Sequence, residues 1–247
     1  MWTRSELKKK GIERLKNNYL MCFLVALIYN YFATNSSGIK VDVNQILKES
    51  NNNMSIVLDH LFDTLLPDSL SRLMSHFNHM GREVVGFLIL FCGILLTIFV
   101  FNMIEVGARR FFVKNLDHKP GAGEMIEVFR DKHYMDNVKT MLMKMVYQFL
   151  WTLLLFIPGI VKGYEYRMIP YILAEHPETS EKEAFRRSKE LMNGEKMNAF
   201  IFDLSFFGWY LLAAVTLNIA GILFVSPYKC CADAQLYEAL KETKGIY

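Results

Sequence analysis

The stretch VVGFLILFCGILLTIFVFNMI, from Val84 to Ile104, contains no charged side chain. A helix needs about 20 predominantly apolar residues to cross the hydrocarbon core of a bilayer. This stretch reaches that length without interruption, and it therefore predicts a membrane helix. Three further stretches also lack charged side chains, and they run from Tyr19 to Thr34, from Met145 to Val161 and from Leu204 to Tyr228.

The composition favours a membrane protein over a soluble domain. Hydrophobic residues make up 52% of the chain, which is above the usual share in globular proteins. The net charge is only +3, so binding to nucleic acid has no electrostatic support. The four cysteines have no spacing typical of a metal site or of a disulfide framework, and we interpret them as small apolar packing residues.

The distribution of basic residues predicts the topology. Six Lys and Arg residues lie in residues 1–18, eight in 105–144 and five in 176–198, and such residues accumulate on the cytoplasmic side of membranes. A hairpin between the last two segments keeps both inside, and Pro158-Gly159 and Asn218–Gly221 supply the turns. We therefore predict six membrane-crossing helices with both termini in the cytoplasm, at residues 19–34, 84–104, 138–156, 159–175, 199–217 and 221–240.

An internal repeat supports this arrangement. The segment from Gly107 to Met141 matches the segment from Gly163 to Met197 at an offset of 56 residues, with Glu, Phe, Arg and Asn at equivalent positions. Each copy leads through a charged amphipathic helix into a new membrane helix, and the N-terminus follows the same plan. The sequence thus predicts an all-α membrane bundle of three units, namely residues 1–116 with an outer insertion at 35–83, residues 117–176 and residues 177–247.

Several motifs resemble those of a known family. They are MWTRSELK at Met1–Lys8, IPGIV at Ile157–Val161, and PYILA at Pro170–Ala174 followed by EAFRRSKELMNG at Glu183–Gly194. Over nearly the whole chain apart from the insertion, the sequence is similar to the bacterial family known as domain of unknown function 975. It is more distantly similar to the membrane domain of some glycerophosphodiester phosphodiesterases. The resemblance implies a multi-pass bacterial membrane protein and provides no catalytic residue to transfer.

Charged residues inside the apolar segments are the candidate site, because ionisable side chains are costly in a membrane. Lys162, Glu165 and Arg167 lie on the fourth predicted helix, and Lys229 and Asp233 lie four residues apart on the sixth. Together with Glu105 and Arg109, such pairs can line a polar central cavity. The alternative is structural ion pairing, or long side chains that reach the interface. We favour the interface for Glu105 and Arg109, and we expect Asp203 to lie within reach of the interface or of a tyrosine. For Lys162, Glu165, Lys229 and Asp233 a function competes with structural ion pairing, which is favoured there too. The charges in residues 159–175 also leave open a short re-entrant segment there.

The function expected from these features is non-enzymatic. The leading hypothesis is a protein of the bacterial cell membrane that binds a lipid, a peptide or a polar ligand, or that assists a membrane complex. The alternative is a transporter or channel that uses the charged residues as its pathway. Basic helices at residues 5–16 and 180–192 favour contact with membrane lipids, and a protein partner or a second copy of the chain stays open. No motif indicates a cofactor, a metal site or a nucleophile.

Overall fold

The computed structural model describes residues 2–36, 88, 91–93, 95–154 and 156–245. The chain divides into two compact units, Met1–Phe32 with Asn102–Tyr247, and Ala33–Phe101. Every regular element in the described part is helical, which confirms the predicted all-α class. The second unit contains the π-helix η1 (Thr97–Phe101). From residue 37 onward, the predicted outer insertion at 35–83 lies outside the described residues.

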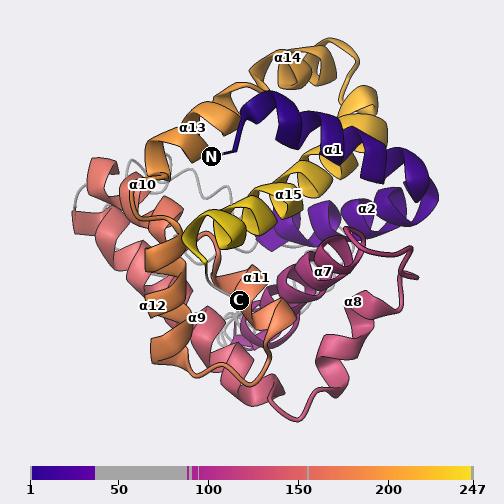
Figure 1. The fold of residues 1–247 in the computed structure, drawn as a ribbon. Helices are drawn as coiled ribbons and strands as arrows, with labels where there is room; N and C mark the ends of the chain where they lie inside the picture. Colours follow the sequence, from indigo (N-terminus) through magenta and orange to yellow (C-terminus); the bar gives the residue numbers. More distant parts are fainter. Residues whose placement is uncertain (1, 37–87, 89–90, 94, 155, 246–247) are drawn as a thin grey trace, which may run out of the picture. The chain divides into compact units, whose positions relative to one another are not determined.

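The first helix packs along the last one. In α1 (Arg4–Asn17) the Thr3 side chain caps the N-terminus by accepting a hydrogen bond from the backbone N–H of Glu6 at 3.3 Å. Its buried face lies against α15 (Ser226–Lys244), and a methyl group on Gly11 would lie only 3.1 Å from the backbone of Ala232. Figure 1 shows α1 crossing α15. The expected charged amphipathic helix at the N-terminus therefore exists and is held by α15.

A polar contact joins the beginning of α2 (Tyr19–Ser36) to the end of α7 (Asn102–Lys114). The Asn18 side-chain amide donates to the Asn115 side-chain oxygen at 3.0 Å and to the Pro120 carbonyl at 3.1 Å. The short helices α8 (Glu124–Glu127) and η2 (Val128–Arg130) then fold back onto α7. Gly107 makes this possible, because a Cβ atom there would lie 2.2 Å from the carbonyl oxygen of Met125.

Replacing Gly107 with alanine is therefore expected to destabilise the protein. The new methyl group collides with backbone rather than with a flexible side chain, and overpacking of this kind costs about 1–3 kcal/mol. We expect a lower melting temperature for purified Gly107→Ala in detergent. Gly208→Ala is the matched control, since it lies in a helix with no atom within 4 Å of the new Cβ. Equal melting temperatures for both variants would contradict the close approach of α7 and α8.

The first hairpin, formed by α9 (Tyr134–Leu154) and α10 (Phe156–Glu165), differs from the predicted boundaries. α9 ends at Leu154 and α10 begins at Phe156, so Pro158 lies in the first turn of α10 rather than at the turn of the hairpin. Proline is tolerated in the first turn of a helix, where its missing N–H has no partner to lose. Gly159 lies so close to α9 that a Cβ atom would lie 2.8 Å from Thr152. The predicted single helix at 159–175 is broken, and after residues 166–168 it resumes as the buried α11 (Ile169–Glu175).

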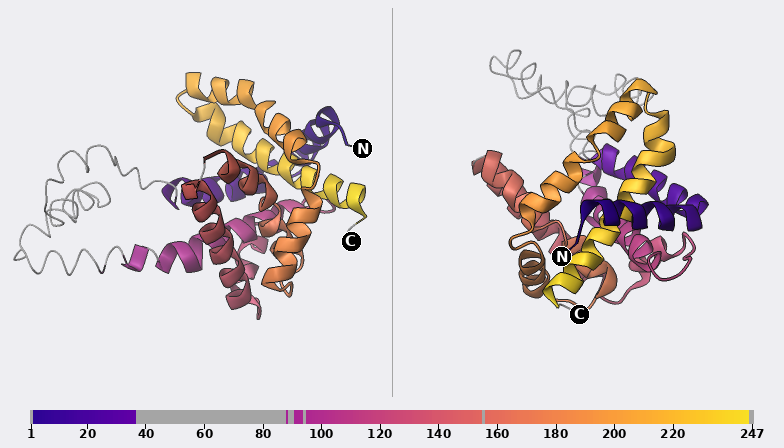
Figure 2. Two further views of the ribbon diagram at one scale, coloured as in Figure 1. Left: turned by 90° about the vertical axis from the view of Figure 1, so that its left-hand side faces the viewer. Right: turned by 45° about the horizontal axis from the view of Figure 1, so that its top comes forward.

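The second hairpin turns where Asn218 and Gly221 predict it. After the amphipathic α12 (Glu181–Leu191), the chain runs through α13 (Lys196–Leu204) and α14 (Phe207–Val215). Leu217 and Asn218 then adopt positive φ angles of 50° and 66°, and the π-helix η3 (Gly221–Val225) leads directly into α15. Figure 2 shows α14 folded back beside the start of α15. We call the segment from α13 through α14 and η3 into α15 the second hairpin.

In the part of the chain that the structure describes, two helices are long and apolar enough to cross a membrane when judged by length and composition, Phe91–Lys114 and Lys196–Val215. They overlap the predicted crossings at 84–104 and 199–217. The helix Tyr19–Phe32 is apolar but shorter.

Candidate functional site

Four charged side chains from three separate segments meet inside the first unit. Arg167 lies in the break between α10 and α11, which the chain needs because Pro170 begins the next helix. Asp203 comes from the last turn of α13, and Lys229 and Asp233 lie one turn apart on α15. We call these four residues the charged cluster.

The charged cluster is held together by charge-assisted hydrogen bonds. The Arg167 guanidinium donates to both carboxylate oxygens of Asp203, at 2.8 Å and 3.0 Å, and to Asp233 at 2.9 Å. Lys229 Nζ lies 3.0 Å from Asp203 and contacts Asp233 directly. The Tyr164 hydroxyl donates to Asp203 at 2.9 Å. Two cations and two carboxylates thus neutralise one another and tie three parts of the fold together.

Arg109 on α7 lies next to the charged cluster but is bound differently. Its guanidinium donates to the Tyr29 hydroxyl at 2.8 Å and lies over the rings of Tyr29 and Tyr171, 4.7 Å and 5.1 Å from their centroids. Its nearest carboxylate, Glu105, is 4.0 Å away and lies closer to Lys144, at 3.3 Å. The buried Nε atom of Arg109 has no hydrogen-bond partner. This cation is therefore stabilised mainly by aromatic faces.

An open cavity of about 400 Å³ adjoins these residues. Its wall contains Arg109 and all four members of the charged cluster. Neutral side chains from α2, α14 and α15 complete it, and they are Tyr29, Asn30, Tyr210, Ser226 and Cys230. The cavity thus combines charged groups, hydroxyl groups and an amide at the meeting point of five helices, which is a composition suited to binding a polar ligand.

The structure divides the residues that the sequence singled out. Arg167, Lys229 and Asp233 line the cavity together, whereas Lys162 and Glu165 form a second ion pair that is not part of its wall. Glu165 is buried and accepts from Lys162 at 2.7 Å and from Lys196 at 2.6 Å. Its backbone carbonyl accepts from the buried Ser188 hydroxyl at 2.7 Å. This pair links α10, α12 and α13, which is a structural role.

Sequence reasoning underestimated Asp203 and Arg109. Asp203 was expected to stay near the interface or a tyrosine, and it does contact Tyr164, but it is also the main partner of Arg167. The signal was the excess of cations: Arg167 and Lys229 need two carboxylates, and Asp233 supplies only one. Arg109 was expected to reach the interface from a helix end, yet its side chain is only 12% exposed.

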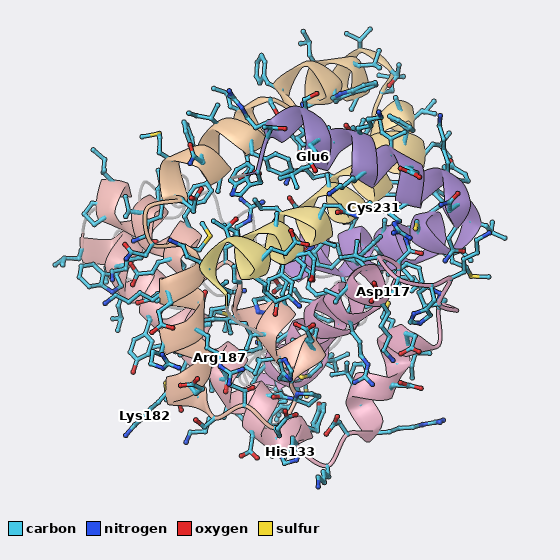
Figure 3. All side chains as sticks on the ribbon, viewed as in Figure 1. Glu6, Asp117, His133, Lys182, Arg187 and Cys231 are labelled. Atoms are coloured by element: carbon cyan, nitrogen blue, oxygen red, sulfur yellow. The ribbon has the colours of Figure 1, made fainter. Side chains whose placement is uncertain are left out.

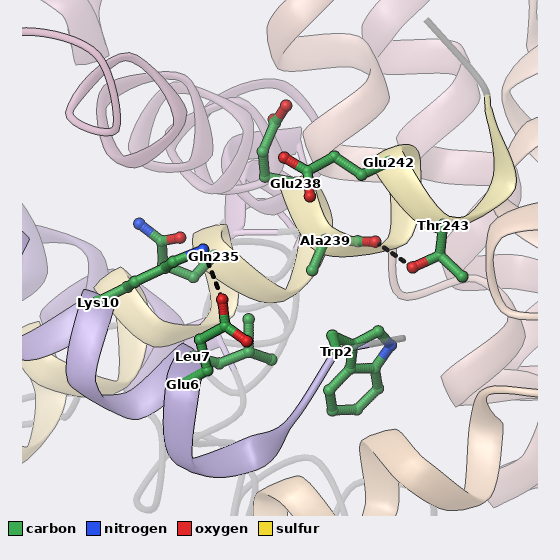
Figure 4. Close-up of a pocket in the computed structure, with 9 residues that line it drawn as sticks. All are labelled: Trp2, Glu6, Leu7, Lys10, Gln235, Glu238, Ala239, Glu242 and Thr243. Carbon is green, nitrogen blue, oxygen red and sulfur yellow. Dashed lines mark hydrogen bonds and ion pairs between the residues drawn. The ribbon is translucent and has the colours of Figure 1, made fainter.

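A second, smaller hollow lies between α1 and α15, at about 210 Å³. Figure 4 shows Trp2 on one side of it and Glu238, Glu242 and Thr243 on the other. Glu6 accepts from Lys10 at 2.9 Å, and this hydrogen bond is the main cause that lowers the pKa of Glu6. Lys10 and Glu6 are about half exposed and neutralise each other, so the larger cavity remains the candidate site.

The fold and the cavity define an all-helical protein with a charged polar site between apolar helices. The family described as protein of unknown function (DUF975) matches residues 1–244, and the chain belongs to this family. No curated protein and no solved structure matches the chain. The more distant resemblance to the membrane domain of glycerophosphodiester phosphodiesterases therefore finds no support.

Proposed function

We propose that this chain is a multi-pass integral membrane protein of the bacterial cell membrane that binds a polar ligand without chemical conversion. Six helical segments lie in the membrane in this proposal: two cross it at 19–34 and 84–104, and the two hairpins enter from the cytoplasmic side and return to it. Both termini are then cytoplasmic. The observation that carries the binding function is the cavity, whose charged wall is surrounded by apolar helices.

The surface of both hairpins supports the membrane location. Leu153 is 73% exposed and Ile157 74% exposed near the turn of the first hairpin, and Val215 and Leu217 are 76% and 88% exposed at the turn of the second. Soluble monomers rarely expose contiguous apolar surface of this kind. In the hydrocarbon core of a membrane, exposing these apolar side chains carries no free-energy penalty.

The charged helices support a cytoplasmic position for the cavity. On α12, Lys182 points away from the helices (Figure 3), and hydrogen bonds from Arg186 and Arg187 lower the pKa of Glu183 to about 2. This carboxylate therefore stays ionised at physiological pH, so the exposed face of α12 stays in water or among lipid headgroups. On α1, Lys8 Nζ donates to the Ser205 carbonyl at 2.6 Å. The charged cluster thus lies directly beneath a charged surface helix.

Filling the cavity tests the proposal. Ser226 lines the cavity at the start of α15, so Ser226→Trp places an indole there and leaves every ion pair unchanged. We expect at least a ~tenfold loss of affinity for the bound ligand, because each 1.4 kcal/mol is a factor of ten. The measurement is native mass spectrometry of the full chain incubated with a bacterial polar lipid extract.

Leu223→Trp is the matched control, since Leu223 lies three residues earlier on the same segment, is exposed, and is not part of the cavity wall. An adduct that persists in Leu223→Trp and disappears in Ser226→Trp supports a ligand in the cavity. If the two variants bind the same adducts as the wild type, the cavity is not the binding site.

A further inference from the structure

Charge counting around the cavity leaves one cation without a carboxylate of its own. Arg167 and Lys229 balance Asp203 and Asp233, and every contact within this set is 3.0 Å or shorter. The wall of the cavity contains one further charged residue, Arg109. Its nearest carboxylate, at 4.0 Å, belongs to Glu105, whose closer partner is a lysine on α9. The wall therefore carries a surplus of one positive charge.

The surroundings of Arg109 leave its positive charge free to bind an anion. The two tyrosine rings contact the guanidinium through their faces, and this contact stabilises the cation without occupying its planar N–H donors. Of these donors, Nη2 binds the Tyr29 hydroxyl, and Nε is buried without a partner. The buried Tyr171 hydroxyl also lacks a partner. A buried cation with free donors is costly to keep unless something binds it.

We propose that the cavity binds an anionic oxyacid group, a phosphate or a carboxylate, with Arg109 as its principal contact. This inference rests on the proposed function and names the class of its ligand. Arginine presents forked N–H donors that match the oxygens of such groups. The two carboxylates of the wall are turned to Arg167 and Lys229, so an anion at Arg109 does not meet an unpaired negative charge. Ser226, Asn30 and Tyr210 are neutral side chains of the same wall that can donate to its remaining oxygens.

Two sources can supply this group, and the position of the cavity beneath α1 is compatible with both. One is the phosphate of a phospholipid headgroup in the cytoplasmic leaflet, and the other is a small soluble phosphate. The probes are therefore phosphatidylglycerol, compared with diacylglycerol as its headgroup-free counterpart, and inorganic phosphate. Native mass spectrometry measures lipid binding to the full chain, and the shift in melting temperature measures binding of inorganic phosphate.

Arg109→Gln is the decisive variant, and Arg110→Gln is its matched control. Arg110 is the next residue on the same helix, but it pairs with Glu124 and Glu127 and does not line the cavity. We expect the affinity for the phosphate-bearing probe to fall by ~10-fold to ~100-fold in Arg109→Gln, as for the loss of a hydrogen bond to a charged group. Arg110→Gln should bind like the wild type, and diacylglycerol should not bind in the cavity of any variant.

The stability of the ligand-free protein separates binding from a structural role. If Arg109 serves to bind an anion, its removal leaves a neutral cavity wall, and the melting temperature of Arg109→Gln should equal or exceed that of the wild type. If Arg109 serves to hold α7 against α2 through Tyr29, both Arg109→Gln and Tyr29→Phe should melt at lower temperature. Tyr29→Phe should retain the phosphate-bearing probe, which keeps the proposal testable even if Arg109→Gln does not fold.

The outcomes assign the source and identify failure. Selective phosphatidylglycerol binding without a phosphate-induced shift supports a lipid headgroup, and a phosphate-induced shift that is absent in Arg109→Gln supports a soluble ligand. Equal binding of both probes by wild type and Arg109→Gln, or binding of neither probe by the wild type, overturns the inference. If Ser226→Trp still displaces some other adduct in that case, the proposed function stands alone. If it displaces nothing, both fail.

Discussion

A cysteine introduced at Asn218, in the turn of the second hairpin, should not react with a membrane-impermeant maleimide applied to intact cells. The turn is formed by apolar neighbours, of which Leu217 is 88% exposed and Ile219 is 61% exposed. In the proposed arrangement it therefore lies in hydrocarbon rather than beyond the far side of the membrane. The same result is expected at Leu154, at the turn of the first hairpin. The assay uses a background in which the four native cysteines have been replaced.

Helix length is the reason for this expectation. Ala232 contacts Gly11 of the charged α1, and only 14 residues separate Ala232 from the turn at Asn218, a distance of about 21 Å along a helix. In the first hairpin, Lys144 lies ten residues from the end of α9, which corresponds to about 15 Å. Both distances are shorter than the hydrocarbon core of about 30 Å. In the proposed arrangement, hairpins anchored at the cytoplasmic surface in this way end inside the membrane, although Lys196–Val215 is by itself long enough to cross.

Backbone groups at both turns have local hydrogen-bond partners, which favours a position inside the membrane. The Asn218 backbone N–H donates to the Ala213 carbonyl at 2.7 Å, and the Ala220 N–H donates to the Thr216 hydroxyl at 3.2 Å. In the first hairpin, the Gln148 amide donates to the Gly159 carbonyl at 2.8 Å. Irregular backbone is tolerated in a membrane only where such partners exist.

Two control positions complete the labelling experiment. Ser50→Cys lies in the predicted outer insertion and should be labelled from outside, and Lys189→Cys on the exposed face of α12 should be labelled only after the membrane is made permeable. Ser188 is unsuitable because its side chain is buried and bonded to the Glu165 carbonyl. Labelling of both Asn218→Cys and Leu154→Cys in intact cells would instead establish hairpins that cross completely, and six crossings would stand.

The sequence could predict the helical class and the turns but not this depth. Hairpins that cross the membrane and hairpins that turn within it both return the basic segments to the cytoplasm, so the positive charges are equally consistent with either. The length of the hydrophobic stretches does not distinguish the two kinds of hairpin either. The uncharged stretch Met145–Val161 is shared between the two predicted helices at 138–156 and 159–175. The proposed depth rests on the contact of Gly11 with Ala232 and on the break after Glu165, and both depend on tertiary packing.

The candidate site could be predicted in part for a similar reason. Pairs four residues apart, such as Lys229 and Asp233, are visible in the sequence because they share a helix face. Partners that are 36 or 66 residues apart, as Arg167 is from Asp203 and Asp233, depend on how the helices pack. Charge balance among buried residues is the remaining signal, and it identifies Asp203 only once the cluster has been located.

Removing Arg167 should destabilise the protein more than any other single change to a charged side chain discussed here. In Arg167→Met, Asp203 and Asp233 share Lys229 as their remaining cation from the cluster, and the side chains of both carboxylates are mostly buried. Breaking a buried ion pair by removing one partner costs about 3–5 kcal/mol. We expect this loss as a lower midpoint of unfolding by denaturing detergent, measured on the purified protein in micelles.

The double variant Arg167→Met with Asp203→Asn distinguishes charge imbalance from lost packing. It removes one charge of each sign and leaves Lys229 paired with Asp233, so the unfolding midpoint should recover part of the loss seen in Arg167→Met. Arg186→Gln is the matched control, since its contacts to Glu183 and Glu190 lie on the surface of α12, where such pairs contribute about 0–1 kcal/mol. If the double variant is less stable than Arg167→Met, the charged cluster does not act as a neutral unit, and the surplus charge assigned to Arg109 loses its basis.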